Sequence, residues 1–101
     1  MRLVFKWSAS KANHNRKKHK VRFEEAKTVF NDPLLVTFPD EEHSETEDRY
    51  ISIGLSAARR ILLVVHTDHE ENETVIEIRI ISARKATASE RRVYEEDEEQ
   101  S

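Results

Sequence analysis

Three arginines occupy positions from which a planar guanidinium group could bind a phosphate. Arg49 begins one alternating, strand-like segment, and Arg79 and Arg84 lie in a later one. Because arginine donates two parallel hydrogen bonds to phosphate oxygens, three arginines on one sheet could form a phosphate cradle. The alternative is structural ion pairing, with Arg49 beside Glu47, Arg79 among the neighbours of Glu77, and Arg84 anchoring the last helix. The spacing alone leaves both interpretations open.

Acid–base chemistry would need an imidazole or a carboxylate close to these arginines. His43 lies in an acidic loop, and an unperturbed imidazole titrates near pH ~6.5, so His43 is the preferred acid or base. Glu47 is the alternative base. His66, inside an apolar segment, is expected to be a hydrogen-bonded histidine of the core or of a sheet edge. His14 and His69 are expected to be surface residues.

Several other kinds of site are not indicated. The chain has no cysteine, which excludes disulfides, thiolate metal ligands and cysteine nucleophiles. His66 and His69 are three residues apart, but a strand-to-turn location does not bring them together, and no HExxH spacing accompanies them. We therefore predict no metal site and no cofactor. The single Gly54 excludes a glycine-rich phosphate loop, and no histidine–acid pattern lies next to Ser44, Ser52 or Ser82.

Composition limits the size and the surroundings of the protein. The 101 residues correspond to one domain, of which 37% are hydrophobic and 37% charged. No stretch approaches the ~18 consecutive apolar residues of a membrane span, and Lys6 interrupts the first apolar run, which is not typical of a signal peptide. We expect a cytoplasmic protein with no membrane contact, consisting of one domain over residues 1–96 and an acidic, frayed tail over residues 97–101.

The net charge of −3 conceals a strong asymmetry along the chain. Residues 1–28 contain nine Lys and Arg against two Asp and Glu, and residues 79–94 contain five against one. The middle of the chain and the tail are acidic. If the two basic segments converge on one face, that face would attract a polyanion despite the acidic total. The alternative is that these charges merely solvate two helices.

Hydrophobic periodicity and turn residues predict eight elements in the order β-α-α-β-β-β-β-α. Helices gathered at the ends around a run of strands indicate an α+β fold with a mostly antiparallel sheet. The last helix should begin at Thr87, because Glu90 follows three residues later in a capping-box pattern. The expected strands are residues 3–7, 34–38, 49–55, 61–67 and 74–83, and the expected helices are residues 9–18, 23–30 and 87–96.

Apolar spacing also predicts the core. The sheet should bury its isoleucine and leucine stripes against the second helix, and Trp7 should be buried as well. Tyr50 alternates away from the isoleucines, so it is the better candidate for stacking on a nucleic-acid base. The predicted sheet residues are Ile51, Ile53, Leu55, Leu63, Ile76, Ile78 and Ile80, and the predicted helix residues are Phe23, Ala26, Val29 and Phe30.

With the elements placed, strings over residues 5–96 resemble the BrnT toxin family. The N-terminal match is Phe5-Lys6-Trp7, a helix with Lys11, Asn15, Lys18 and His19, then Val21-Arg22-Phe23-Glu24-Glu25-Ala26 and Val29-Phe30-Asn31-Asp32-Pro33. The remaining strings are His43-Ser44, residues 47–54, the most specific one, Arg79-Ile80-Ile81-Ser82-Ala83-Arg84, and residues 85–95. Two positions differ from the family pattern. Lys20 stands where the family usually has a glycine that would cap the helix, and Ser8-Ala9 replaces an aspartate-proline pair.

The resemblance implies a RelE-like ribonuclease toxin of a type II toxin–antitoxin system, which inhibits translation by cleaving RNA. It implies a BrnA-type ribbon-helix-helix antitoxin, with operator DNA contacted only through that antitoxin. On this reading the cleavage is metal-independent, with Arg49, Arg79 and Arg84 on phosphate and His43 or Glu47 as acid–base residue. Lys18, His19 and Tyr50 would bind RNA. The alternative function is a non-catalytic module that binds protein or nucleic acid.

Overall fold

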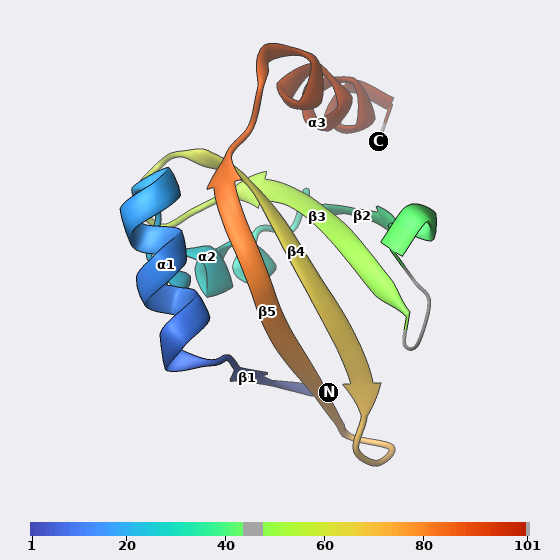
Figure 1. The fold of residues 1–101 in the computed structure, drawn as a ribbon. Coiled ribbons are helices and arrows are strands. Elements are labelled where there is room, and N and C mark those ends of the chain that lie inside the picture. Colours follow the sequence, from blue (N-terminus) through green and yellow to red (C-terminus); the bar gives the residue numbers. More distant parts are fainter. Residues whose placement is uncertain (44–47, 101) are drawn as a thin grey trace.

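The computed structural model describes residues 1–43 and 48–100, and it confirms the α+β fold and the predicted order of elements (Figure 1). Two short 3-10 helices, η1 and η2, add to that order. None of the described helices is long and apolar enough to cross a membrane. The elements are β1 (Arg2–Lys6), α1 (Ala9–His19), α2 (Phe23–Ala26), η1 (Lys27–Asn31), β2 (Val36–Pro39), η2 (Glu41–His43), β3 (Arg49–Leu55), β4 (Ile61–Glu70), β5 (Val75–Lys85) and α3 (Ala88–Gln100).

The five strands form one sheet in the order β1-β5-β4-β3-β2. The pairs β2–β3, β3–β4 and β4–β5 are antiparallel, as predicted, whereas β1 runs parallel to β5 along Val75–Arg79. The start of the chain therefore lies beside a strand from its last third. This arrangement carries the first basic segment towards the second.

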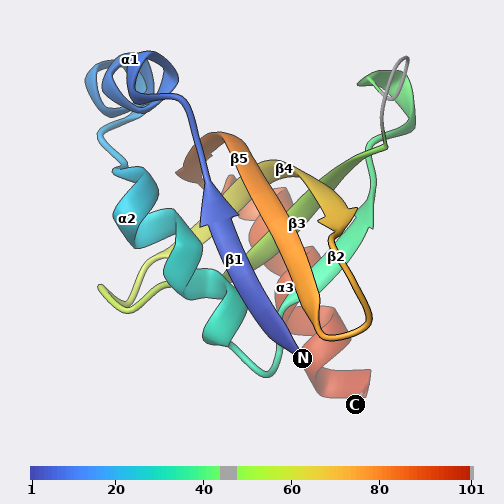
Figure 2. The same cartoon turned by 90° about the horizontal axis from the view of Figure 1, so that it is seen from below.

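Both faces of the sheet are covered, and each has its own core. The α1 face, which α1, α2 and η1 cover, buries Ile78 and Ile80 with Phe23 and Val29. The opposite α3 face buries Ile53 and Leu63 with Tyr94 of α3. Figure 2 shows α2 and α3 on opposite sides of the sheet.

The predicted core is thus correct for Ile78 and Ile80 of β5, whereas Ile53 of β3 and Leu63 of β4 are buried as predicted but on the α3 face, not against the second helix. Ile51 and Ile53 do not pack against the second helix, because on β3 the residues that face it are Ser52 and Gly54. A Cβ at Gly54 would lie 3.2 Å from Cβ of Val29, so the glycine permits the close approach of η1. Periodicity identifies the residues that share one face of a strand, but not the layer that covers that face.

Two element boundaries differ from the prediction because of contacts that Asp32 makes. The predicted helix 23–30 is divided into α2 and the 3-10 helix η1, and β2 begins at Val36 rather than Leu34. The Asp32 carboxylate accepts hydrogen bonds from the Leu34 and Leu55 N–H groups at 2.9 and 2.8 Å, and from the Tyr94 hydroxyl at 2.6 Å. Residues 32–35 therefore form a turn that ties η1 to β3 and α3.

Lys20 takes the role that glycine usually has at the end of a helix. It is the C-cap residue of α1, with φ 61° and ψ 30°, and its N–H donates to the Arg16 carbonyl at 3.0 Å. A side chain in this left-handed conformation costs roughly 1 kcal/mol that glycine would not. The chain therefore ends α1 at His19 in spite of the substitution.

Asn15 joins α1 to the sheet. β1 pairs only with the first half of β5, so the second half would have an unpaired edge. Asn15, 3% exposed, fills this gap, since its amide donates to the Ala83 carbonyl at 2.8 Å and accepts from the Ala83 N–H at 3.0 Å. The same amide donates to the Val21 carbonyl at 3.0 Å. One side chain thus acts as a short substitute strand.

We predict that Asn15→Ala destabilises the fold by at least about 2 kcal/mol, because each buried peptide group that loses its partner costs about 1–3 kcal/mol. Urea unfolding followed by circular dichroism measures the change. The matched control is Asn13→Ala, an exposed asparagine of the same helix, which should change stability by less than about 0.5 kcal/mol. Equal effects of the two substitutions would contradict the role of Asn15.

Candidate functional site

Two of the predicted arginines lie in one row across the α3 face. Arg49 of β3 pairs with Thr67 of β4, Thr67 pairs with Arg79 of β5, and Arg79 pairs with Lys6 of β1. Directly paired residues point to the same side of a sheet, and Ile78 and Ile80, which flank Arg79, are buried on the other side. We call Lys6, Arg49, Thr67 and Arg79 the basic row.

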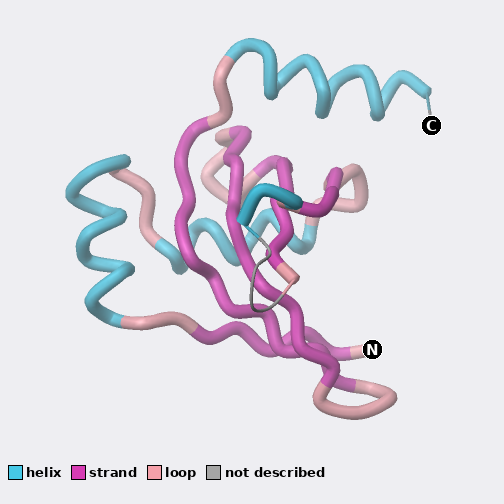
Figure 3. The backbone as a smooth tube through the Cα atoms, turned by 45° about the vertical axis from the view of Figure 1, so that its right-hand side comes forward, coloured by secondary structure: helices cyan, strands magenta, loops and turns pink. Residues whose placement is uncertain are grey.

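The basic row lies at the end of this face that α3 does not cover. α3 packs on Ile53 and Leu63, towards one end of the strands, and Figure 3 shows the strands continuing well beyond it. Lys6 forms an ion pair with Glu77 at 2.9 Å. The Arg79 side chain is exposed and makes no hydrogen bond or ion pair with another described residue, and its charge contributes to lowering the pKa of Glu77, whose main partner is Lys6. The Arg79 guanidinium group is therefore available to an anionic ligand.

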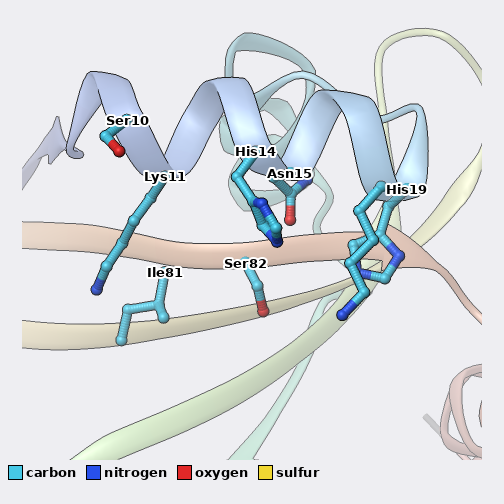
Figure 4. Close-up of a pocket in the computed structure, with 8 residues that line it drawn as sticks. Ser10, Lys11, His14, Asn15, His19, Ile81 and Ser82 are labelled. Atoms are coloured by element: carbon cyan, nitrogen blue, oxygen red, sulfur yellow. The ribbon is translucent and has the colours of Figure 1, made fainter.

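Near the basic row, α1 and β5 border a surface pocket of about 500 Å³, which we call the α1–β5 pocket. In Figure 4, Lys11, His14 and His19 extend from α1 across β5, where Ile81 and Ser82 lie. The pocket thus brings together the two basic segments, residues 1–28 and 79–94. A face on which they converge would attract a polyanion. The lining residues are Ser10, Lys11, His14, Asn15, Lys18, His19, Ile81 and Ser82.

The electrostatic environment of His19 confirms this convergence. Burial lowers the pKa of His19, and the positive charges of Lys18 and Arg84 together with His14 lower it further. The lowered pKa favours the neutral ring, in which one nitrogen donates and the other accepts. Lysines and a neutral imidazole provide different recognition groups in the same pocket.

Arg84 holds the last helix in place. Its guanidinium group forms a bidentate pair with Glu90, at 2.7 and 2.8 Å. The Glu90 carboxylate also accepts from the Thr87 N–H at 2.8 Å, which completes the predicted capping box. These bonds, above all the one from Arg84, lower the pKa of Glu90 to about 2, and the bond to Glu90 raises that of Arg84. Arg84 thus makes the anchoring contact that the sequence left open.

His43 lies at the corner of the sheet where the basic row ends. Its Nδ1 lies 3.1 Å from Oδ2 of Asp40, and its side chain is 60% exposed. The Asp40 N–H donates to the Arg49 carbonyl at 2.8 Å, which places η2 next to the start of β3. Glu47, the alternative base, lies outside the described residues.

Tyr50 lies on the opposite face from the basic row. It pairs with His66, and the two rings stack with centroids 6.0 Å apart on the α1 face. The structure therefore brings Arg49 and Arg79 together, and Lys18 and His19 with Arg84, but it does not bring Tyr50 to either group. The alternation correctly predicts that Tyr50 points away from Ile51 and Ile53. These two isoleucines, however, share the α3 face with the arginines.

A serine–histidine–aspartate chain is present that the sequence did not indicate. Nε2 of His66 lies 2.7 Å from Oγ of Ser52, and its Nδ1 lies 2.7 Å from Oδ1 of Asp68. Ser52 also contacts the Thr37 hydroxyl at 2.7 Å. Since Ser52 and His66 are at most 1% exposed, no substrate reaches the hydroxyl, and the chain stabilises the sheet as a buried network. Only the strand register brings these residues together.

No group of three or more potential metal ligands gathers among the described residues. A protein-family model described as "Ribonuclease toxin, BrnT, of type II toxin-antitoxin system" matches residues 7–90. The chain belongs to the BrnT toxin family. It is therefore a ribonuclease toxin by family, whose target is RNA and whose partner is a protein antitoxin.

The BrnT fold is found in the structural comparison as well. A 1.1 Å crystal structure of the Brucella abortus ribonuclease toxin BrnT superposes with a TM-score of 0.61 and 20% sequence identity. The match covers 86% of this chain and 99% of the Brucella chain. No curated protein sequence matches the chain. At this identity the likeness establishes the fold, and the site residues have to be argued from this BrnT chain itself.

We predict that the Arg84–Glu90 pair makes stability depend on pH below about 5. The folded-state pKa of Glu90, about 2, is below the ordinary value of 4.5, so its contribution is fully present above 4.5 and is lost as pH falls towards 2. This shift corresponds to about 3 kcal/mol, which partial exposure of the pair reduces to about 2 kcal/mol. Urea unfolding of Glu90→Gln should therefore show a deficit at pH 7 that shrinks towards pH 3. The control, Glu95→Gln at an exposed position of α3, should show none. A deficit for Glu90→Gln that is independent of pH would refute this linkage.

Proposed function

We propose that this chain is a metal-independent endoribonuclease that inhibits translation by cleaving RNA. The observation that carries the proposal is the basic row, in which Arg49 and Arg79 flank the buried Thr67 on the part of the sheet that α3 does not cover. Two guanidinium groups on adjacent sides of one site can hold both non-bridging oxygens of a phosphodiester. The strand register fixes the backbone positions from which both side chains extend.

The reaction uses the RNA itself as nucleophile. The ribose 2′-oxygen attacks the neighbouring phosphorus, its proton passes to a base, and the bond to the 5′-oxygen breaks as an acid protonates that oxygen. The products are a 2′,3′-cyclic phosphate and a free 5′-hydroxyl. Arg49 and Arg79 would stabilise the pentavalent phosphorane that forms between these steps. Because the nucleophile is internal, no metal-bound water is required.

The acid–base roles fall to the corner of the sheet beside Arg49. His43 is exposed there and paired with Asp40, so it can exchange a proton with solvent and with a bound strand. Glu47 remains the alternative base. Arg84 would add positive potential while it holds α3, and Lys18 and His19 would bind the flanking RNA. The position of Tyr50 on the other face gives no support to its stacking on this substrate.

We predict that the purified protein, free of its antitoxin and in excess EDTA, cleaves single-stranded RNA and leaves DNA of the same sequence intact, since DNA lacks the 2′-hydroxyl. Arg79→Ala should slow cleavage by about 10²–10³-fold, the usual effect of removing one group that stabilises the transition state. Gel analysis of labelled oligonucleotides, with and without purified ribosomes, measures both.

The matched control is Arg22→Ala, which removes an exposed arginine beside α2 without a side-chain capping bond and should keep the rate within about twofold. Cleavage that returns only with added magnesium would exclude the metal-independent mechanism. Binding without cleavage in every condition would favour the non-catalytic module instead.

The antitoxin partner is proposed to be a BrnA-type ribbon-helix-helix protein that covers the basic row and α1. Operator DNA would be contacted only through this antitoxin. Residues 1–28 contain nine Lys and Arg against two Asp and Glu, and Lys11 and Lys18 on α1 are exposed. An acidic segment of the antitoxin would neutralise this charge and block the basic row.

We predict that the affinity of this complex falls with salt, because the screening length shrinks from about 10 Å at 0.1 M to about 3 Å at 1 M. Isothermal titration across this range should show the dissociation constant rising about tenfold or more. Lys18→Ala should lower the affinity at 0.1 M and reduce the salt dependence. An affinity that does not change with salt would remove the electrostatic argument while leaving the partnership intact.

A further inference from the structure

The floor of the α1–β5 pocket results from an irregularity in strand pairing. Val65 of β4 pairs with Ser82, but the next residue, His66, pairs with Ile80, so Ile81 is an additional residue in β5. Such a β-bulge re-aims side chains and occurs often beside active sites. Here Ile81 and Ser82 both line the pocket beneath α1, next to the point where Asn15 holds the helix on Ala83.

The lining groups suit the parts of a nucleotide. Lys11 and Lys18 are exposed cations that can bind a phosphate, and they extend from the same helix. The hydroxyl of Ser82 and the ring of His14 can hydrogen-bond to a base edge or a ribose, while Ile81 offers an apolar contact to a base. The volume of about 500 Å³ is within the usual range for small-ligand sites, which is about 300–1,000 Å³.

The pocket also lies at a suitable distance from the basic row. Ser82 is three residues from Arg79 along β5, which at about 3.3 Å per residue corresponds to roughly 10 Å. We propose that the α1–β5 pocket binds one nucleotide of the RNA strand, adjacent to the phosphodiester on the basic row. Lys11 would contact its phosphate, and His14 and Ser82 its base or ribose. This assignment rests on the proposed ribonuclease function, to which it adds a subsite that sets sequence preference.

The neutral state of His19 supports this assignment. A pocket made only of cations would bind any anion, including an acidic peptide. A neutral imidazole beside Lys18 can both donate to and accept from a base, which a carboxylate ligand does not need. Hydroxyl, imidazole and apolar groups around the lysines therefore favour a nucleotide over an isolated acidic peptide.

Nucleotide binding can be tested without any cleavage. The ¹⁵N-labelled protein is titrated with the four ribonucleoside 5′-monophosphates, with inorganic phosphate and with a poly-glutamate peptide. At least one nucleotide should shift the amide signals of Lys11, His14 and Ser82, with an affinity about tenfold above that of inorganic phosphate. Nucleotides that bind no better than phosphate, or a peptide that binds the same residues more tightly, would overturn the assignment.

Matched variants locate the site. Lys11→Ala and Ser82→Ala should each weaken the preferred nucleotide by about fivefold or more. Lys17→Ala removes an equal charge from the same helix outside the pocket and should change affinity by less than about twofold. Equal losses for Lys11→Ala and Lys17→Ala would reduce the effect to general charge and overturn the proposal.

Cleavage patterns separate this proposal from the ribonuclease assignment. In a random-sequence RNA pool, Ser82→Ala and His14→Ala should alter the preferred cleavage sites, whereas Lys17→Ala should not. If both variants cut RNA at the same sites as the wild type and no nucleotide binds, the subsite is overturned. The ribonuclease assignment then still stands. Specific nucleotide binding by a protein that cuts no RNA would support the pocket and remove the ribonuclease.

Discussion

The pairing of the Asn15 amide with the Ala83 peptide group determines how the rest of the molecule is arranged. Without it α1 would have little reason to contact the sheet, since Ala12 is its only apolar side chain in contact with the core and its last turn is entirely basic. The bonds are buried, so they persist against the repulsion between two segments of like charge. Their geometry also fixes the height of the helix above Ile81 and Ser82. A hydrogen bond that completes the edge of a sheet therefore also shapes a pocket.

A second set of polar contacts holds α3 over one end of the α3 face, so that α3 does not cover the other end. Arg84 and Glu90 fix the start of α3, and Tyr94 secures its middle on Asp32. On the other side of the sheet, Arg60 and Ser56 bind Glu25, which ties α2 to the turn between β3 and β4 and lowers the pKa of that carboxyl, chiefly through Arg60. The rigid elements thus present Arg49 and Arg79 from the middle of a sheet. The sheet therefore fixes the positions of the two backbones before a substrate binds.

Most of the fold can be predicted from the sequence because the signals are local. Period-two alternation identifies the long strands, and the spacing of Thr87 and Glu90 identifies the start of α3. The layer that covers Ile53 cannot be predicted in this way, because alternation in one strand does not reveal what packs on it. Nothing in the sequence indicates the role of Asn15, since one asparagine in a polar helix has the appearance of a solvated residue. The network around His66 was also missed, because its members come from β2, β3 and β4 and only register brings them together. The arginines were identified as candidates by their residue type, and their common row could not be known before the pairing of β1, β5, β4 and β3.

The parallel pairing of β1 with β5 has a consequence for the order in which the molecule can assemble. Lys6 pairs with Arg79, and the Asn15 amide donates to Ala83, so both contacts join residues about 70 positions apart. Contacts of such sequence separation form late in folding, because a long loop has to close first. During synthesis α1 emerges from the ribosome long before β5 exists. A growing chain therefore cannot pair β1 with β5, or bring Lys6 beside Arg79, until β5 has been made.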